Sequence, residues 1–253
     1  MKTTLTVAVG LLLFQLTPSA QVAFEVASVK ENKTIAGGGS MRMMPGGGIT
    51  AQHISARSLI ATAFRLQSFQ LTGVPAWAAE TYYDVNAKTA EPATREQSFD
   101  MLQALLVERF KLTFHRESRE VDGFVLVQVR NGVLGPKLRQ SAVDCAQSFA
   151  TTPQCKQGSV THSPAGSSMK AVGAQMSRLL QLVIGQVGAP VSDETKLTGT
   201  FDFDIQWSDE VAPANDLTSI YTALQEQLGL KLEKRRVSTE IFVVDRLERP
   251  TPD

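Results

Sequence analysis

The sequence has few of the residues that usually hold metals or perform nucleophilic catalysis. Its 253 residues include only three histidines and two cysteines. No histidine has a second histidine or a cysteine at metal-ligand spacing, and the motifs His-Glu-x-x-His and Gly-x-Ser-x-Gly do not occur. We therefore expect no metal site, no cofactor and no catalytic residues.

A net charge and a long apolar run are also missing. The 25 Lys and Arg residues balance the 25 Asp and Glu residues, which argues against a sequence-independent attraction to nucleic acid. Residues 5–16 form the main apolar run, which is too short for a bilayer core that needs about 20 residues.

This run has the features of a secretory signal peptide. Lys2 precedes it, and the small residues at 17–20 precede Gln21. We expect cleavage after Ala20 or at a neighbouring bond, which gives an exported protein, periplasmic or extracellular, without a membrane span. A buried N-terminal helix is the alternative.

The two cysteines, Cys145 and Cys155, lie in one polar segment at residues 138–168. In an exported protein such a pair predicts a disulfide that closes a small loop. A redox or metal role would need a helix start or further ligands, and the neighbouring sequence shows neither.

The chain is similar to itself at a shift of 118 to 120 residues. At a shift of 118, Asp84 aligns with Asp202, and apolar positions of the two parts stay in register through the segments that follow. We therefore expect a tandem duplication. Further aligned pairs are Leu106 with Leu224, Phe110 with Leu228, Phe124 with Phe242 and, at a shift of 120, Leu59 with Leu179.

Both copies show the same order of strand and helix patterns. The alternating or apolar strand segments are residues 49–51, 82–87, 112–114 and 124–129, with counterparts at 169–171, 200–207, 230–232 and 241–244. The amphipathic helices are residues 55–64 and 99–110, with counterparts at 175–184 and 220–228. Ser55 is the expected cap of the first helix, and Gly185 and Gly229 the expected helix ends. Short connections between the last two strands of each copy predict a hairpin.

These patterns predict an α+β fold built as a tandem duplication of a β-α-β-β-α-β-β unit, with helices on small mixed or antiparallel sheets. The predicted divisions are a signal peptide (1–20), a first repeat with an N-terminal edge strand (21–137), a linker with the disulfide loop (138–168), a second repeat (169–247) and a tail (248–253).

Five short segments resemble the uncharacterised secreted proteins that are numerous in soil acidobacteria. They are residues 24–30 (Phe-Glu-Val-Ala-Ser-Val-Lys), 74–77 (Val-Pro-Ala-Trp), 105–112, 197–203 and 223–230. The resemblance covers nearly all of the mature chain. It implies export, sometimes behind a membrane metallopeptidase that resembles antibiotic sensors, and it implies no established activity.

Each half also resembles the short N-terminal domain of secretins and TonB-dependent receptors. The shared helix pattern, Ala-Leu-x-x-x-Leu-Gly-Leu, is present at residues 223–230, whereas the first copy has Lys111 in the place of Gly229. That domain docks other proteins, so the resemblance implies a docking role by analogy of fold.

One loop, residues 37–48, carries Met41, Arg42, Met43 and Met44 between two glycine triplets. Methionine makes adaptable apolar contacts, so these four residues are the candidate contact with a partner. Their thioethers are also ligands that Cu(I) prefers, and ordinary packing is a third interpretation. We interpret the glycines as a flexible hairpin tip.

Two pairs of acids recur, Asp84 with Asp202 and Glu108 with Glu226. Paired carboxylates perform acid–base chemistry when they face one bond, but here each pair is divided between the copies. We expect these acids to bind backbone groups or an arginine such as Arg109.

The sequence therefore favours a secreted or periplasmic, non-enzymatic module that recognises another envelope or secreted protein. Free strand edges and the loops at residues 37–48 and 141–168 are the expected contact surfaces. The alternatives are an extracytoplasmic hydrolase with a site between the two repeats, and a sensor of a small ligand or metal that uses the methionines.

Overall fold

The structure is a computed structural model, which describes residues 23–34, 38–143, 155, 158–164, 166–208 and 218–250. It is an α+β fold, as predicted, and its strands form three four-stranded sheets. The contacts divide it into a first unit (residues 1–64, 77–112 and 248–253) and a second unit (residues 65–76 and 113–247). The predicted signal peptide and Cys145 lie outside the described residues, and the predicted boundaries of the repeats stay a prediction.

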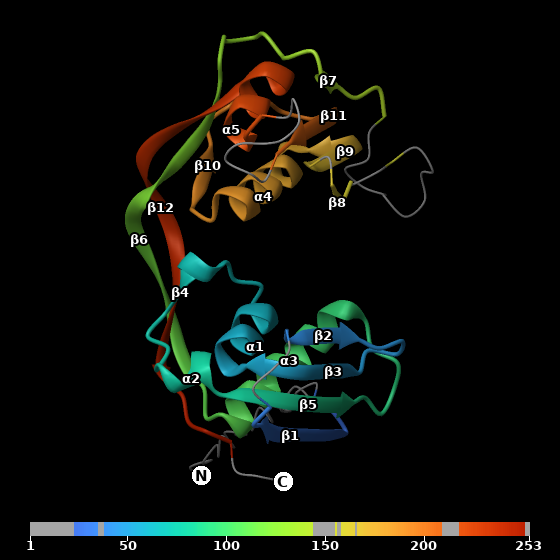
Figure 1. The fold of residues 1–253 in the computed structure, drawn as a ribbon, viewed down its shortest axis with the longest axis vertical. Helices are drawn as coiled ribbons and strands as arrows, with labels where there is room; N and C mark the ends of the chain where they lie inside the picture. Colours follow the sequence, from blue (N-terminus) through green and yellow to red (C-terminus); the bar gives the residue numbers. More distant parts are fainter. Residues whose placement is uncertain are drawn as a thin grey trace, which may run out of the picture. The chain divides into compact units, whose positions relative to one another are not determined.

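The first unit contains one antiparallel sheet with the strand order β1-β5-β3-β2 (Figure 1). Its strands are β1 (Val26–Asn32), β2 (Ser40–Met43), β3 (Ile49–Ser55) and β5 (Tyr82–Lys88). The helices α1 (Ala56–Ala63) and α3 (Arg95–Arg109) contact each other and cover one face of the sheet, and the short α2 (Trp77–Glu80) contacts α1. The alternating residues of β5 that face the helices are buried, which explains the alternation in the sequence.

Local sequence sets the ends of both long helices of this unit. The Ser55 hydroxyl accepts a hydrogen bond from the Ser58 N–H at 3.2 Å, so the predicted cap is confirmed. Thr94 and Gln97 form a capping box at the start of α3. Beyond the other end of α3, Lys111 adopts the left-handed conformation with φ 51°.

The second unit contains a sheet with the order β7-β11-β9-β8. Its strands are β7 (Leu138–Gln140), β8 (Val160–Ser163), β9 (Gly166–Gln175) and β11 (Thr200–Trp207). Its core also includes α4 (Met176–Val187), α5 (Ile220–Ala223) and the π-helical turn η2 (Leu224–Leu228).

The predicted end of one helix is wrong and that of the other is confirmed. Helix α4 continues through Gly185 and ends at Gly188, whose φ of 62° gives the left-handed cap. Apolar Ile184 and Val187 pack against the core, so the helix gains burial by continuing past Gly185. Gly229 ends η2 with φ 70°, as predicted.

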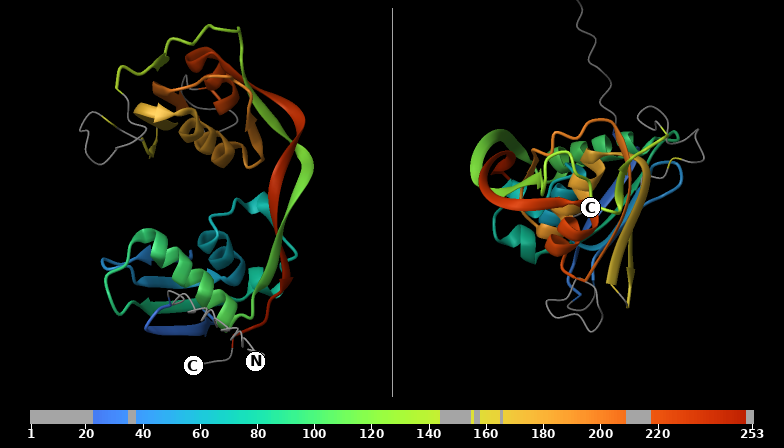
Figure 2. Two further views of the ribbon diagram at one scale, coloured as in Figure 1. Left: turned by 180° about the vertical axis from the view of Figure 1, so that it is seen from behind. Right: turned by 90° about the horizontal axis from the view of Figure 1, so that it is seen from above.

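The third sheet has the order β10-β6-β12-β4, and it corrects the predicted hairpins. In each predicted copy, the last two predicted strands are one continuous strand, β6 (Thr113–Gln128) or β12 (Leu230–Arg246). These two strands pair antiparallel along their whole length (Figure 2). Two short strands pair parallel to them: β10 (Val191–Asp193) with β6, and β4 (Leu71–Thr72) with β12. The turn η1 (Ser68–Gln70) precedes β4. Residues 115–122 contain no Gly, Pro or Asn that would favour a turn, and the long ladder gives their backbone groups partners.

Several backbone features recur at the predicted shift. His53 and Gly173 occupy the bulges of β3 and β9, with φ 50° and 68°. Lys111 and Gly229 have the same left-handed conformation. In the third sheet, β10 pairs with Phe124 on β6 as β4 pairs with Phe242 on β12. These features support the hypothesis of a duplication.

Candidate functional site

The methionines of the predicted contact loop line a pocket at the edge of the first sheet. Met41 and Met43 pair with Ala51 and Ile49, which are fully buried, so both methionines lie on the face of the sheet that the helices cover. Together with Met44, they surround a pocket of about 400 Å³ that Thr62 of α1 and Phe99 of α3 complete. We call this pocket the β2 groove.

Beside this groove, the backbone of β2 has hydrogen-bonding groups that point away from the sheet. The Met44 N–H donates to the Gly48 carbonyl at 2.7 Å, which makes these two residues a hydrogen-bonded pair. Because such pairs alternate in an antiparallel ladder, Arg42 bonds to β3, whereas Met41 and Met43 direct their N–H and C=O groups outward. In the described part of the chain, no strand pairs with this outer edge.

The glycines hold the turn that follows β2 against the start of α3. Pro45 and Gly46, with φ 87° at Gly46, form the turn, and the Gly46 carbonyl accepts hydrogen bonds from the Ala93 N–H at 3.1 Å and the Thr89 hydroxyl at 2.8 Å. At Gly47, whose φ is 91°, a Cβ atom would lie only 2.7 Å from the Cβ of Ala93. The Gly46 carbonyl and the Gly47 backbone therefore contact the segment before α3, while the flexibility expected of the glycines stays a prediction.

Arg95 supplies charge at the end of the β2 groove next to this turn. Among the described residues that line the groove, it is the only charged one. It is the first residue of α3, and its guanidinium lies 5.7 Å from the centroid of the Phe99 ring. Sequence analysis missed Arg95, although a basic residue in the first turn of a helix is electrostatically unfavourable and is a usable signal.

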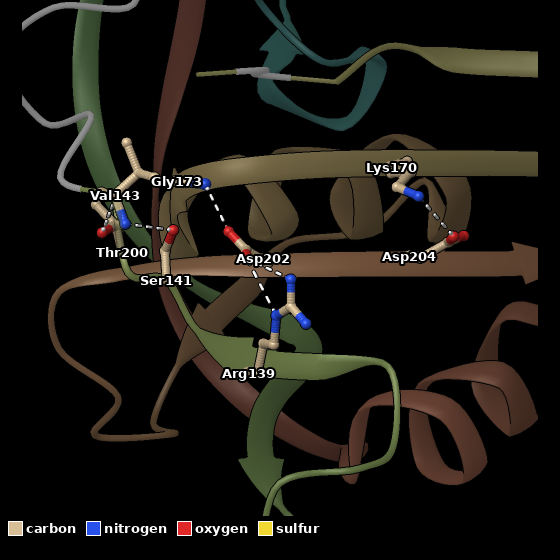
Figure 3. Close-up of polar contacts among 8 residues, drawn as sticks. All are labelled: Arg139, Ser141, Val143, Lys170, Gly173, Thr200, Asp202 and Asp204. Carbon is tan, nitrogen blue, oxygen red and sulfur yellow. Dashed lines mark hydrogen bonds and ion pairs between the residues drawn. The ribbon is translucent and has the colours of Figure 1, made fainter. Parts of the chain in front are cut away.

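The repeated acids Asp84 and Asp202 have structural partners. Asp202 accepts hydrogen bonds from the Gly173 N–H at 3.0 Å and from two guanidinium nitrogens of Arg139 at 3.0 and 3.1 Å (Figure 3). Burial raises the pKa of the Asp202 carboxyl. Hydrogen bonds from Ser141, Gly173 and Arg139 lower this pKa by more than burial raises it, so it lies below its ordinary value.

Asp84 makes the corresponding contacts in the first unit. Its carboxylate accepts hydrogen bonds from the Asn32 amide and from the His53 N–H, both at 2.9 Å, and these bonds lower its pKa. Both acids therefore bind the backbone of a bulge, as the structural interpretation predicted. Asn32 is a side-chain partner of Asp84, and the arginine that binds Asp202 is Arg139 and not Arg109. Glu108 and Glu226 are exposed on helical segments.

A second pocket, of about 270 Å³, lies on the face of the second unit that carries Asp202. Arg139, Lys170 and Asp204 line it beside Asp202, and Lys170 lies 3.7 Å from Asp204 (Figure 3). Arg139 and Lys170 therefore pair with Asp202 and Asp204, and Lys137, which also lines the pocket, adds one positive charge at its exposed surface.

The three histidines have separate surroundings. The His53 ring stacks on Tyr82 with centroids 4.1 Å apart, and His162 Nδ1 lies 2.7 Å from the Ser167 hydroxyl. His115, 51% exposed, lies 2.8 Å from Asp245 through Nδ1, a pairing that depends on the β6–β12 register and was missed from sequence. Both partners are exposed, so water screens the interaction between them.

In the described ranges, no cluster of three or more His, Cys, Asp or Glu side chains is placed to hold a metal ion. None of the helices within the same ranges has the length and apolar character to cross a membrane.

Comparison with known proteins assigns a family. A family model described as a protein of unknown function, DUF3738, matches residues 57–247. No curated protein and no solved structure matches the chain. The match covers most of the sequence, so the chain belongs to the DUF3738 family, and an uncharacterised family is what the sequence motifs predicted.

Proposed function

We propose that this member of the DUF3738 family is an exported, non-enzymatic module that binds an extended segment of another envelope or secreted protein along β2. The observation that carries the proposal is the combination of outward backbone groups on Met41 and Met43 with an apolar groove beside them. In strand addition, main-chain hydrogen bonds supply affinity and adjacent pockets accept alternate side chains.

Export is supported by the sequence of residues 1–20 and by the resemblance to secreted proteins of soil acidobacteria. The resemblance to the docking domain of secretins and TonB-dependent receptors agrees with a binding role. A disulfide between Cys145 and Cys155 belongs to the same proposal. Mass spectrometry of the secreted protein tests both points: we expect a chain that starts at Gln21 and lacks the mass of two hydrogens until it is reduced.

The binding role is tested by panning the mature protein, residues 21–253, against a phage-displayed library of random peptides. We expect selected peptides to lose binding to Met43→Pro, because this change removes an outward N–H without removing a ladder hydrogen bond. Val107→Ser changes an exposed apolar residue of α3 that does not line the groove, and it is the control. Equal binding to wild type and Met43→Pro would reject docking along β2.

One observation favours a second candidate. Three thioethers, from Met41, Met43 and Met44, line the same pocket, and Cu(I) prefers such ligands. A copper-sensing role requires saturable Cu(I) binding in competition with a Cu(I) chelator, and this binding must disappear when the three methionines are replaced by leucine. Retention of binding in the leucine variant would exclude these ligands.

A further inference from the structure

From the geometry of the β2 groove we infer that its ligand is an extended segment with the pattern acidic-x-apolar-x-apolar, added antiparallel to β2, with the acidic side chain on Arg95. This inference rests on the proposed function, because it specifies the ligand of the same groove.

The direction follows from the sheet itself. Every neighbouring pair of strands in the order β1-β5-β3-β2 is antiparallel. Antiparallel pairing is also somewhat more stable per residue than parallel pairing. An antiparallel segment begins near the turn that follows Met43 and ends near Ser40.

The two apolar positions follow from the register. Met41 and Met43 direct their backbone groups outward, so each forms a hydrogen-bonded pair with the ligand residue directly opposite. Residues opposite each other in a sheet place their side chains on the same face. The ligand side chains opposite Met43 and Met41 therefore lie on the helix side, where Phe99 and Thr62 line the groove.

The acidic position follows from Arg95. The ligand residue two places before the one opposite Met43 lies on the same face and beside the turn. There the Gly46 carbonyl is bound by the Ala93 N–H at 3.1 Å, and Arg95 follows Ala93 closely in the chain. The carboxylate that binds Arg95 is a side chain of the ligand. It is not the C-terminal carboxylate, because an antiparallel ligand places its N-terminal end beside Arg95.

Arg95 is suited to an external carboxylate. Among the residues that the structure describes, no carboxylate forms an ion pair with it, and its guanidinium lies over the Phe99 ring. Its position at the N-terminal residue of α3 adds a positive charge where the helix dipole is already positive, and both attract a carboxylate. A carboxylate on the ligand supplies the missing negative charge.

The experiment measures binding of a fluorescein-labelled, amidated peptide containing Glu-Thr-Leu-Thr-Leu by fluorescence anisotropy. We expect the wild-type protein to bind the peptide with Gln in place of Glu about fivefold more weakly than the Glu peptide. The Arg95→Gln variant is expected to bind the two peptides with equal affinity. Arg42→Gln is the matched control, because Arg42 bonds to β3 with its backbone and lies on the other face of β2. This variant retains the preference for Glu.

The outcomes separate this inference from the proposed function. If the Glu and Gln peptides bind equally to the wild type but neither binds Met43→Pro, strand addition stands and the acidic position is overturned. If the reversed pattern, Leu-Thr-Leu-Thr-Glu, binds more tightly, the antiparallel direction is overturned. If peptides selected on the wild type bind Met43→Pro equally well, the proposed function fails as well.

Discussion

Glu120 lies directly opposite Ser238 in the β6–β12 ladder, and these two residues are separated by the same shift of 118 residues at which the sequence is similar to itself. Equivalent residues that face each other mark the centre of a symmetric pairing. Accordingly, Phe114 pairs with Val244 as Leu126 pairs with Leu232, and these are again equivalent positions. A pair of strands with this register is expected if two copies of one unit exchange their last strands, which supports the hypothesis of a duplication.

This relationship predicts the effect of charge at the centre of the ladder. In Ser238→Glu, two carboxylates face each other, so we expect the free energy of unfolding to fall by about 0.5 kcal/mol. Ser238→Lys places an opposite charge there and is expected to be neutral or stabilising. Urea unfolding of both variants at low salt tests the register, and an equal effect of Glu and Lys would contradict it.

A second prediction concerns the pH dependence that Asp202 gives to stability. Its pKa is lower in the folded protein than in the unfolded chain, so the folded state is favoured above the unfolded pKa and loses this contribution as pH falls through the folded pKa. Asp202→Asn is therefore expected to destabilise the protein near neutral pH by about 1 kcal/mol and to flatten the loss of stability below about pH 4.

Thermal unfolding between neutral and acidic pH measures this effect. Asp204→Asn is the control, because Asp204 is more exposed and pairs with Lys170 only at 3.7 Å. A pH profile of Asp202→Asn that matches the wild type would show that the hydrogen bonds from Gly173 and Arg139 contribute no stability.

A third prediction uses the equivalent left-handed residues, Lys111 and Gly229. A non-glycine residue in this conformation costs about 1 kcal/mol, and Lys111→Gly removes this cost. Glycine also increases the conformational entropy of the unfolded chain, so we expect the free energy of unfolding to rise by only about 0.5 kcal/mol. Gly229→Lys is expected to lower it by more than 1 kcal/mol, because a Cβ there would lie 2.6 Å from the Gly135 nitrogen. Denaturant unfolding that gives both changes the same sign would contradict this assignment.

Much of the fold could be predicted where one face of an element is buried. The strand predicted at residues 200–207 matches β11 (Thr200–Trp207), because its odd-numbered residues form the core, whereas Asp202, Asp204 and Gln206 are less buried. The middle of β6 could not be predicted in the same way. Most of residues 115–122 are exposed, so no alternation marks them as a strand, and only the apolar ends were recognised.

The methionines of the site were predictable from sequence, but Arg95 and the geometry of the groove were not. The methionines stood out by composition, whereas the groove depends on the pairing of Met41 with Ala51 and on the packing of α3, which are contacts between distant segments. The same limit applies to Asp84 and Asp202. The sequence identified them as repeated acids and favoured a structural role. Their partners Asn32 and Arg139 lie on β1 and β7, and the separation in sequence between acid and partner differs in the two cases, so the repeat did not predict these pairs.

The last prediction connects the turn after β2 with binding. Gly47→Ala introduces a methyl group 2.7 Å from the Cβ of Ala93 at a residue with φ 91°, so the turn has to move away from the start of α3. We expect a loss of about 1 to 3 kcal/mol in unfolding free energy and weaker binding of peptides selected on the β2 groove. Gly38→Ala is the control, because a Cβ at Gly38 meets no atom within 4 Å. If Gly47→Ala destabilises the protein but binds these peptides with unchanged affinity, the ligand does not depend on the position of this turn, and the contact with Arg95 has to be rejected.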